Sequence, residues 1–265
     1  MKNTLPFEFA YQLGALLAAI IVVHLLYITI VRPNAEAILA VEAERSAAGE
    51  TFVQERSIYV VLRDYEQESC FMLMIWALAI MGYKTRSAFG ERALLDEQII
   101  PVSEGTSILP EDTREYARPI QAMPAERQQY LLPRALLAAL QRFASTRNVQ
   151  DVSEAVKATC DAESERLDSE LSMVRYIAWA IPAIGFIGTV RGIGEALSQV
   201  YKAVEGDIAG VTASLGTAFN STLVALLISI VIMFFMHQLQ LIQDRLVLET
   251  QNYCDQRLIR HLQVR

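Results

Sequence analysis

The feature that most restricts the fold of this chain is an uncharged apolar stretch near its C-terminus. Residues 208–236 contain no Asp, Glu, Lys or Arg. About 20 residues of apolar helix are enough to cross the hydrocarbon core of a bilayer. A second apolar stretch begins at residue 180, and Arg191 is the first charged residue after its start. The sequence therefore predicts two membrane-crossing helices, residues 173–194 and 211–237, joined by a short loop at 195–210.

Both predicted helices carry a face of small residues. At 3.6 residues per turn, one stripe of the second helix contains Ser214, Ala218, Ser221, Thr222, Ala225 and Ser229. The first helix has a similar face, made of Pro182, Gly185, Gly188, Thr189 and Gly192. We expect a kink at the proline, and close helix packing at the glycines. By themselves, the small stripes fit either helix packing or a hydrated path.

These residues carry a family resemblance. Residues 182–193 read PAIGFIGTVRGI, and residues 215–226 read LGTAFNSTLVAL. The two segments resemble the last two membrane helices of the MotA/TolQ/ExbB proton channel family, in the same order. The resemblance covers about a quarter of the chain.

The resemblance implies an inner-membrane ion-channel subunit of a bacterium. Members form a homopentamer around two membrane helices of a dimeric partner of the ExbD/TolR/MotB type, which carries a transmembrane Asp, and the flow of H⁺ or Na⁺ drives rotation. Thr189 and Thr222 match the threonines that line the family's pore. Thr217 stands where ExbB-like members often have a glutamate. The predicted ion pathway is lined by Thr189, Thr222, Ser221, Ser214, Ala218 and Ala225.

The rest of the chain fits a membrane protein with polar portions. Of the 265 residues, 53% are hydrophobic, and the mean hydropathy is +0.27. The net charge of −7 gives no support for nucleic-acid binding. Three widely spaced cysteines suggest neither disulfides nor a metal cluster. The sequence has no phosphate-binding loop, zinc motif or catalytic serine or cysteine context, so we predict neither an enzyme nor a bound cofactor.

The remaining segments set the predicted topology. Residues 1–32 hold a first membrane helix, which we expect to end at Arg32 and Pro33, and residues 33–68 form a polar loop. Residues 69–84 are apolar but short, because fourteen helical residues cover about 21 Å of a roughly 30 Å core. Residues 85–172 form a helical cytoplasmic region, in which one helix is expected to be capped near Asp151 or Ser153. Residues 238–265 form a C-terminal cytoplasmic helix. One long helix is expected to run from residue 152 into the membrane.

We therefore expect an all-α membrane protein with four crossings, or with three if residues 69–84 do not cross. Four crossings place the N-terminus inside, as in MotA, and three place it outside, as in ExbB and TolQ. Lys84 and Arg86 favour a cytoplasmic end for the short segment. The four-crossing arrangement places Arg32 at the outer end of the first helix, and this position argues mildly against four crossings.

The expected function is the channel subunit of a rotary motor that is driven by an ion-motive force. Hydroxyl groups can order water but cannot bind and release a proton near neutral pH. The titrating acid must then come from the partner. A structural membrane scaffold without an ion pathway is the alternative.

Overall fold

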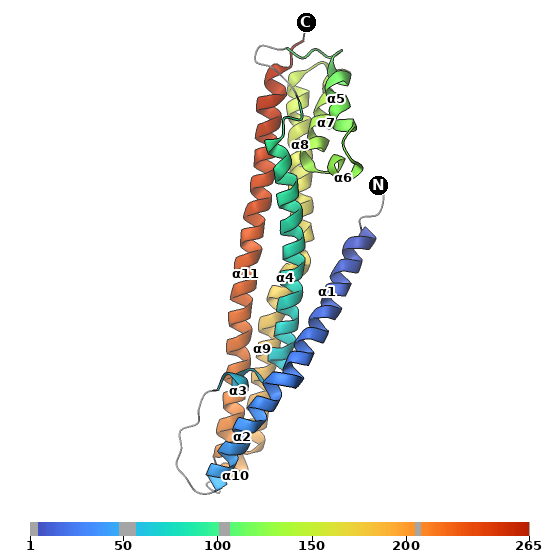
Figure 1. Cartoon of the computed structure of the whole chain (residues 1–265). Coiled ribbons are helices and arrows are strands. Elements are labelled where there is room, and N and C mark those ends of the chain that lie inside the picture. The colour runs from blue at the N-terminus through green and yellow to red at the C-terminus, as the bar shows by residue number, and fades with distance from the viewer. Residues whose placement is uncertain (1–4, 48–56, 101–106, 205–207, 265) are drawn as a thin grey trace. The chain divides into compact units, whose positions relative to one another are not determined.

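The computed structural model describes residues 5–47, 57–100, 107–204 and 208–264. Their regular structure is helical, which confirms the all-α prediction (Figure 1), and one isolated bridge joins Ile108 to Leu262. The chain divides into two compact units. The first unit comprises residues 1–81 and 173–236, and the second comprises residues 82–172 and 237–265.

The first membrane helix does not end where the sequence suggested. α1 (Leu5–Leu26) continues through a π turn, η1 (Tyr27–Val31), into α2 (Arg32–Ala47). Proline normally disrupts a helix because its ring clashes with the preceding turn. Here the wider π turn lies directly before Pro33 and relieves that clash, so the helix carries on. Residues 48–56 of the predicted polar loop lie outside the described residues.

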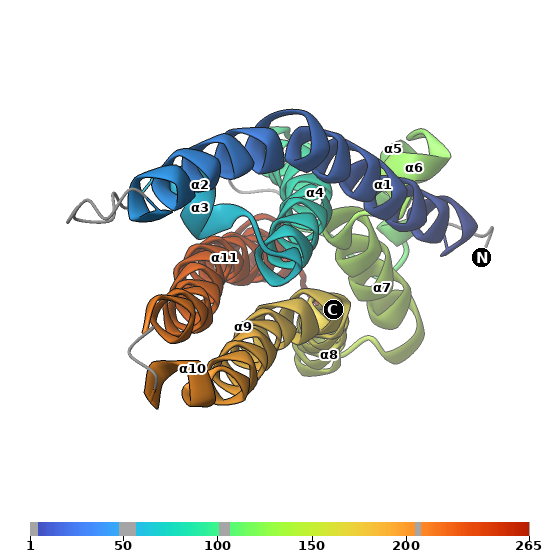
Figure 2. The same ribbon diagram turned by 90° about the horizontal axis from the view of Figure 1, so that it is seen from below.

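α4 is longer than the apolar run that it contains. α3 (Ile58–Leu62) is capped by the Ser57 side chain, and α4 (Tyr65–Arg92) follows after two residues. The run predicted at residues 69–84 lies inside α4, with acidic residues in the first turn and Arg92 in the last. In the first unit α4 lies between α1 and the pair formed by α9 and α11 (Figure 2).

The long helix predicted from residue 152 is interrupted once. α8 (Val149–Glu170) and α9 (Ser172–Ser198) are separated at Leu171, and α9 runs through Pro182 without an interruption. The cap of α8 is Asn148, whose side chain accepts a hydrogen bond from the Gln150 N–H, and not Asp151 or Ser153. The N-cap lies outside the apolar periodicity, which is why the pattern misplaced it. α10 (Val200–Val204) precedes α11 (Ala209–Arg257).

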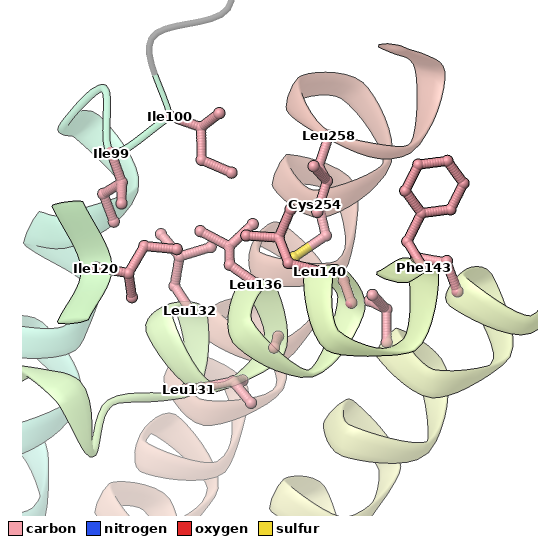
Figure 3. Close-up of a cluster of buried hydrophobic side chains, with 14 of the residues drawn as sticks. Ile99, Ile100, Ile120, Leu131, Leu132, Leu136, Leu140, Phe143, Cys254 and Leu258 are labelled. Carbon is pink, nitrogen blue, oxygen red and sulfur yellow. The ribbon is translucent and has the colours of Figure 1, made fainter. Parts of the chain in front are cut away.

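The second unit has its own hydrophobic core. It contains η2 (Ala93–Asp96), α5 (Thr113–Gln121), α6 (Ala125–Gln128), α7 (Leu131–Thr146), α8, the end of α11 and η3 (Ile259–His261). Leu132, Leu136 and Leu140 of α7 point towards Cys254 of α11 and towards Leu258, the residue that follows this helix (Figure 3). At the start of α7, the Glu91 carboxylate accepts a hydrogen bond of 3.0 Å from the backbone N–H of Leu131. Burial raises the pKa of the Glu91 carboxyl.

Three stretches of the described residues are long and apolar enough to cross a membrane. They are Glu8–Glu42, Val149–Ser198 and Ala209–His261. α4 is not among them, so the predicted fourth crossing is not confirmed. Each stretch exposes large apolar side chains in the single chain, as lipid contact requires, for example Leu17, Phe186 and Phe234.

Candidate functional site

Small residues pack α9 tightly against α11. A Cβ atom built on Gly185 would lie 2.4 Å from the Ala225 Cβ, and one on Gly192 would lie 2.7 Å from the Ala218 Cβ. Real side chains do not approach so closely, so only glycine fits these two positions. We call this crossing the seam; it consists of Gly185, Gly188 and Gly192 of α9 and Ser214, Ala218, Ser221 and Ala225 of α11.

The four seam residues of α11 are buried within a single copy of the chain. Ala218 and Ala225 are fully buried, and Ser221 is 1% exposed. Ser214 is also buried, and its Oγ accepts a hydrogen bond from the Gln199 amide at 3.2 Å. These side chains contact α9 and its surroundings, so their small size serves helix packing in the single chain.

Thr189 and Thr222 lie at one edge of the seam and are only partly buried. Their hydroxyl groups hydrogen-bond to each other. The Ala218 carbonyl oxygen lies 3.2 Å from the Thr189 Oγ1, and the Gly185 carbonyl oxygen lies 3.1 Å from the Thr222 Oγ1, so each hydroxyl proton has the other threonine and a carbonyl as alternative acceptors. The structure thus brings together two residues that are 33 positions apart in the sequence.

The other edge of the seam is covered by three consecutive polar residues in the first turn of α4. Glu66 bonds the Arg191 guanidinium of α9 through two N···O contacts of 2.9 Å. The next residue, Gln67, donates from its amide to the Ser221 hydroxyl of α11 at 3.4 Å. We call Glu66, Gln67 and Glu68 the α4 triplet. The three residues are 9%, 0% and 3% exposed, in that order along the chain.

Glu68, the third member, reaches α1. Its carboxylate contacts the His24 Nδ1 at 2.6 Å and the Arg32 guanidinium. Positions eight apart in a regular α-helix differ by about 80° around the axis. The π turn at Tyr27–Val31 adds about one residue to the turn between them, which brings both side chains to the same carboxylate.

The two edges of the seam have different chemistry. On α9, Thr189 and Arg191 are two residues apart and so lie about 160° from each other around the helix. α4 contacts Arg191 and Ser221, and therefore it covers the side away from the threonine pair. One edge presents hydroxyl groups, and the opposite edge holds buried charges.

Three other residues of this region have partners within the chain. Arg191 lies 3.7 Å from Glu195, but the hydrogen bonds of its guanidinium go to Glu66. Thr217 contributes its carbonyl, which accepts the Ser221 hydroxyl at 3.1 Å. His24 is bonded to Glu68 and does not stand alone in its helix.

Sequence reasoning missed the α4 triplet. They fall at the end of the predicted polar loop, residues 33–68, because that range is polar and rich in Ala and Glu. Their position just before an apolar helical run could have identified them, because charged side chains in the first turn of such a helix need partners from neighbouring helices.

The arrangement fits the ordering of water or an ion. Hydroxyl and carbonyl oxygens at the threonine edge can coordinate a cation or order water. In the described residues no group of three or more His, Cys, Asp or Glu side chains is placed to hold a metal ion.

Comparison with known proteins bears on the same helices. Residues 127–252 match the MotA/TolQ/ExbB proton channel family, which confirms the resemblance for a region that contains α9 and most of α11. The match covers just under half of the 265-residue chain. No curated protein and no solved structure matches the chain.

Proposed function

Because residues 127–252 are those of the MotA/TolQ/ExbB proton channel family, we propose that this chain is the channel subunit of a motor driven by an ion-motive force. Five copies surround two membrane helices of an ExbD/TolR/MotB-type partner in a bacterial inner membrane, and H⁺ or Na⁺ flow is converted into mechanical work. The family is a membrane channel family, and no known enzyme family is implied.

The observation that carries this proposal is the threonine edge of the seam. Thr189 and Thr222 are held together by a hydrogen bond and are only partly buried in a single copy. α1 and α4 cover one side of α9 and α11 and leave the threonine edge uncovered. In a ring of five copies, this uncovered side can face the central axis. Each copy then contributes two hydroxyl groups to a polar lining, while Ser214, Ala218, Ser221 and Ala225 hold α9 and α11 together behind it.

The charges on the other edge do not replace the partner's acid. Glu66 and Glu68 are already bound to Arg191 and to His24 and Arg32, and they lie on the side of the seam away from the threonines. A transmembrane carboxylate of the partner, ringed by the threonines, therefore remains the titrating group in this proposal.

We also propose that α4 is the fourth membrane crossing. Its residues run beside α1 over about three turns, from Glu68, which contacts His24, to Ala79, whose carbonyl accepts a hydrogen bond from Tyr11 at 3.2 Å. The Cys70 thiol lies 3.7 Å from the Ile181 carbonyl of α9. α4 is thus enclosed by helices that are apolar enough to span, and its polar residues meet protein partners. Its low hydropathy is compatible with a crossing for that reason.

Thr222→Val tests the ion pathway. Valine has nearly the shape of threonine but lacks the hydroxyl, which leaves the Gly185 carbonyl and the Thr189 hydroxyl without this partner. We expect a loss of about tenfold in ion flux through the complex reconstituted with its partner, since one such bond is worth about 1 to 2 kcal/mol. The assembly of the complex, measured by size-exclusion chromatography, should not change.

The matched control is Thr212→Val on the same helix. Thr212 is exposed, and its hydroxyl donates to the Ile208 carbonyl at 2.9 Å, within its own helix. Its flux should equal that of the natural chain. If the chain is a scaffold without an ion pathway, Thr222→Val and Thr212→Val should be equally active as long as both assemble. That result would refute the channel proposal.

Labelling of introduced cysteines tests the four-crossing topology. Cys70, Cys160 and Cys254 are buried, so they give little background with a membrane-impermeant thiol reagent. We expect Ser198→Cys to react in intact cells, and Glu8→Cys to react only after the membrane is opened. Reaction of Glu8→Cys in intact cells would instead place the N-terminus outside and leave three crossings.

A further inference from the structure

Two buried side-chain atoms of the first unit have no hydrogen-bond partner among the described residues. They are the Tyr27 hydroxyl of η1 and the amide oxygen of Gln67 in α4. Tyr27 is 2% exposed and Gln67 is 0% exposed. A buried polar atom without a partner carries the full cost of leaving water, so nearly all such atoms bond to protein or to an ordered water. These two atoms therefore need a partner that the chain itself does not supply.

Both atoms lie where η1 packs on the first turn of α4. The ring centroids of Tyr27 and Phe71 are 6.5 Å apart, and Phe71 follows Gln67 by four residues, so it shares a face of α4 with Gln67. The guanidinium carbon of Arg32 lies 5.9 Å from the Tyr27 ring centroid. The same guanidinium bonds Glu68, the residue after Gln67. The Tyr27 ring is thus held against α4 within about one turn of Gln67.

The surroundings of the Tyr27 ring are apolar. Its buried neighbours Val23 and Val31, and the side chains packed against this cluster, contain no oxygen or nitrogen atom: Leu62, Phe71 and Met72. The Gln67 amide uses its nitrogen for the Val61 carbonyl at 3.0 Å and for the Ser221 hydroxyl at 3.4 Å, and its oxygen is left over. The described side chains around the ring therefore offer no partner for either atom.

A water molecule has the hydrogen-bonding groups that the two atoms lack. The tyrosine hydroxyl can donate a hydrogen bond, whereas the amide oxygen can only accept one. A water placed between them accepts from Tyr27 and donates to Gln67. Buried waters in proteins make two to four such bonds to groups that would otherwise be unsatisfied.

We propose that a structural water molecule binds between η1 and α4, held by the Tyr27 hydroxyl and the Gln67 amide oxygen. Because the Gln67 nitrogen already donates to Ser221, the water completes a hydrogen-bonded connection from η1 through α4 to α11. It fixes the π turn against the first turn of α4 and so helps to position the α4 triplet. The inference goes beyond the proposed function and does not rest on it, since a channel and a scaffold need the same helix positions.

Hydroxyl-radical footprinting of the full chain in detergent tests for the water. X-rays generate the radicals from water, so a buried ring is oxidised only where a water lies beside it, and mass spectrometry measures the oxidation of each side chain. We expect Tyr27 to be oxidised although it is buried. Phe143, which is 0% exposed in the core of the second unit, should stay unreactive. Gln67→Leu removes the acceptor and should abolish the oxidation of Tyr27, whereas Gln12→Leu, the same substitution in α1, should leave it unchanged.

Tyr27→Phe tests the same site through stability. If the hydroxyl is dry and unpartnered, its removal relieves a buried polar group and raises the midpoint of thermal unfolding. If the hydroxyl bonds the water, its removal leaves the water and Gln67 short of a partner, and the midpoint should fall by about 2 to 4 °C. Tyr59→Phe is the control and should not move the midpoint, because Tyr59 is 37% exposed and its hydroxyl can reach solvent.

The results decide the water site independently of the channel. An unreactive Tyr27 in the natural chain, an oxidation of Tyr27 that Gln67→Leu leaves unchanged, or a higher midpoint for Tyr27→Phe would each overturn the site. Loss of the oxidation in Gln67→Leu, with a lower midpoint for Tyr27→Phe, would establish it. If Gln67→Leu does not fold, the natural chain and Tyr27→Phe decide. Neither measurement involves ion flux, so failure of the channel proposal leaves the water site in place, and the reverse also holds.

Discussion

Replacing Gly192 by valine is expected to separate α9 from α11 and to destabilise the chain by about 3 kcal/mol or more, since overpacking of this kind forces backbone shifts. A Cβ at this position would lie 2.8 Å from the Ser214 carbonyl oxygen and 2.9 Å from the Ala218 backbone nitrogen. Both atoms belong to the backbone of α11, so no side-chain rotation relieves the contact. The measurement is the midpoint of thermal unfolding of the purified chain in detergent, followed by circular dichroism.

Gly194 provides the control on the same helix. A Cβ at Gly194 meets nothing within 4 Å, so Gly194→Val should leave the midpoint nearly unchanged, since the helix propensities of glycine and valine differ by under about 0.5 kcal/mol. If both variants unfold at the same temperature, the seam does not hold α9 and α11 together as described.

Glu66→Gln is expected to cost about 2 to 3 kcal/mol of unfolding free energy. Removing one member of a buried ion pair leaves the other charge uncompensated, at about 3 to 5 kcal/mol. We take a lower value because the Arg191 side chain is 40% exposed and Asp64 lies 3.8 Å away. The same thermal unfolding experiment, calibrated with denaturant, measures the change.

Glu195→Gln removes another acid near the same arginine and serves as the control. That contact is 3.7 Å long and joins side chains that are 40% and 49% exposed, so its loss should cost less than about 1 kcal/mol. The double variant Glu66→Gln with Arg191→Gln should recover part of the stability, because no uncompensated guanidinium is left. Equal effects of Glu66→Gln and Glu195→Gln would show that the buried pair does not anchor α4.

The helices at the seam could be predicted because their signal is local. An uncharged run of this length has few stable solutions other than a membrane helix, and small residues at helical spacing indicate a packed face. The same logic applied to α1, although the position of Pro33 led to a helix end that the π turn removes.

α4 shows where local reasoning stopped. Hydropathy compares each residue in lipid with the same residue in water, so the polar α4 triplet has the hydropathy of a loop. The actual cost of burying Glu66 or Glu68 depends on arginines that lie far away in the sequence, in α9 and α2.

The sequence by itself determined that this is an all-helical membrane protein, which family its last helices resemble, and which threonines are candidates for an ion pathway. Each of these follows from the composition and spacing of neighbouring residues. Only the tertiary structure decided which residues of the small stripe are buried at the seam and that Glu66, Gln67 and Glu68 each hold a different helix. Those outcomes depend on partners supplied by distant segments, and the free energy of a buried polar group is set by its partner and not by its own position in the chain.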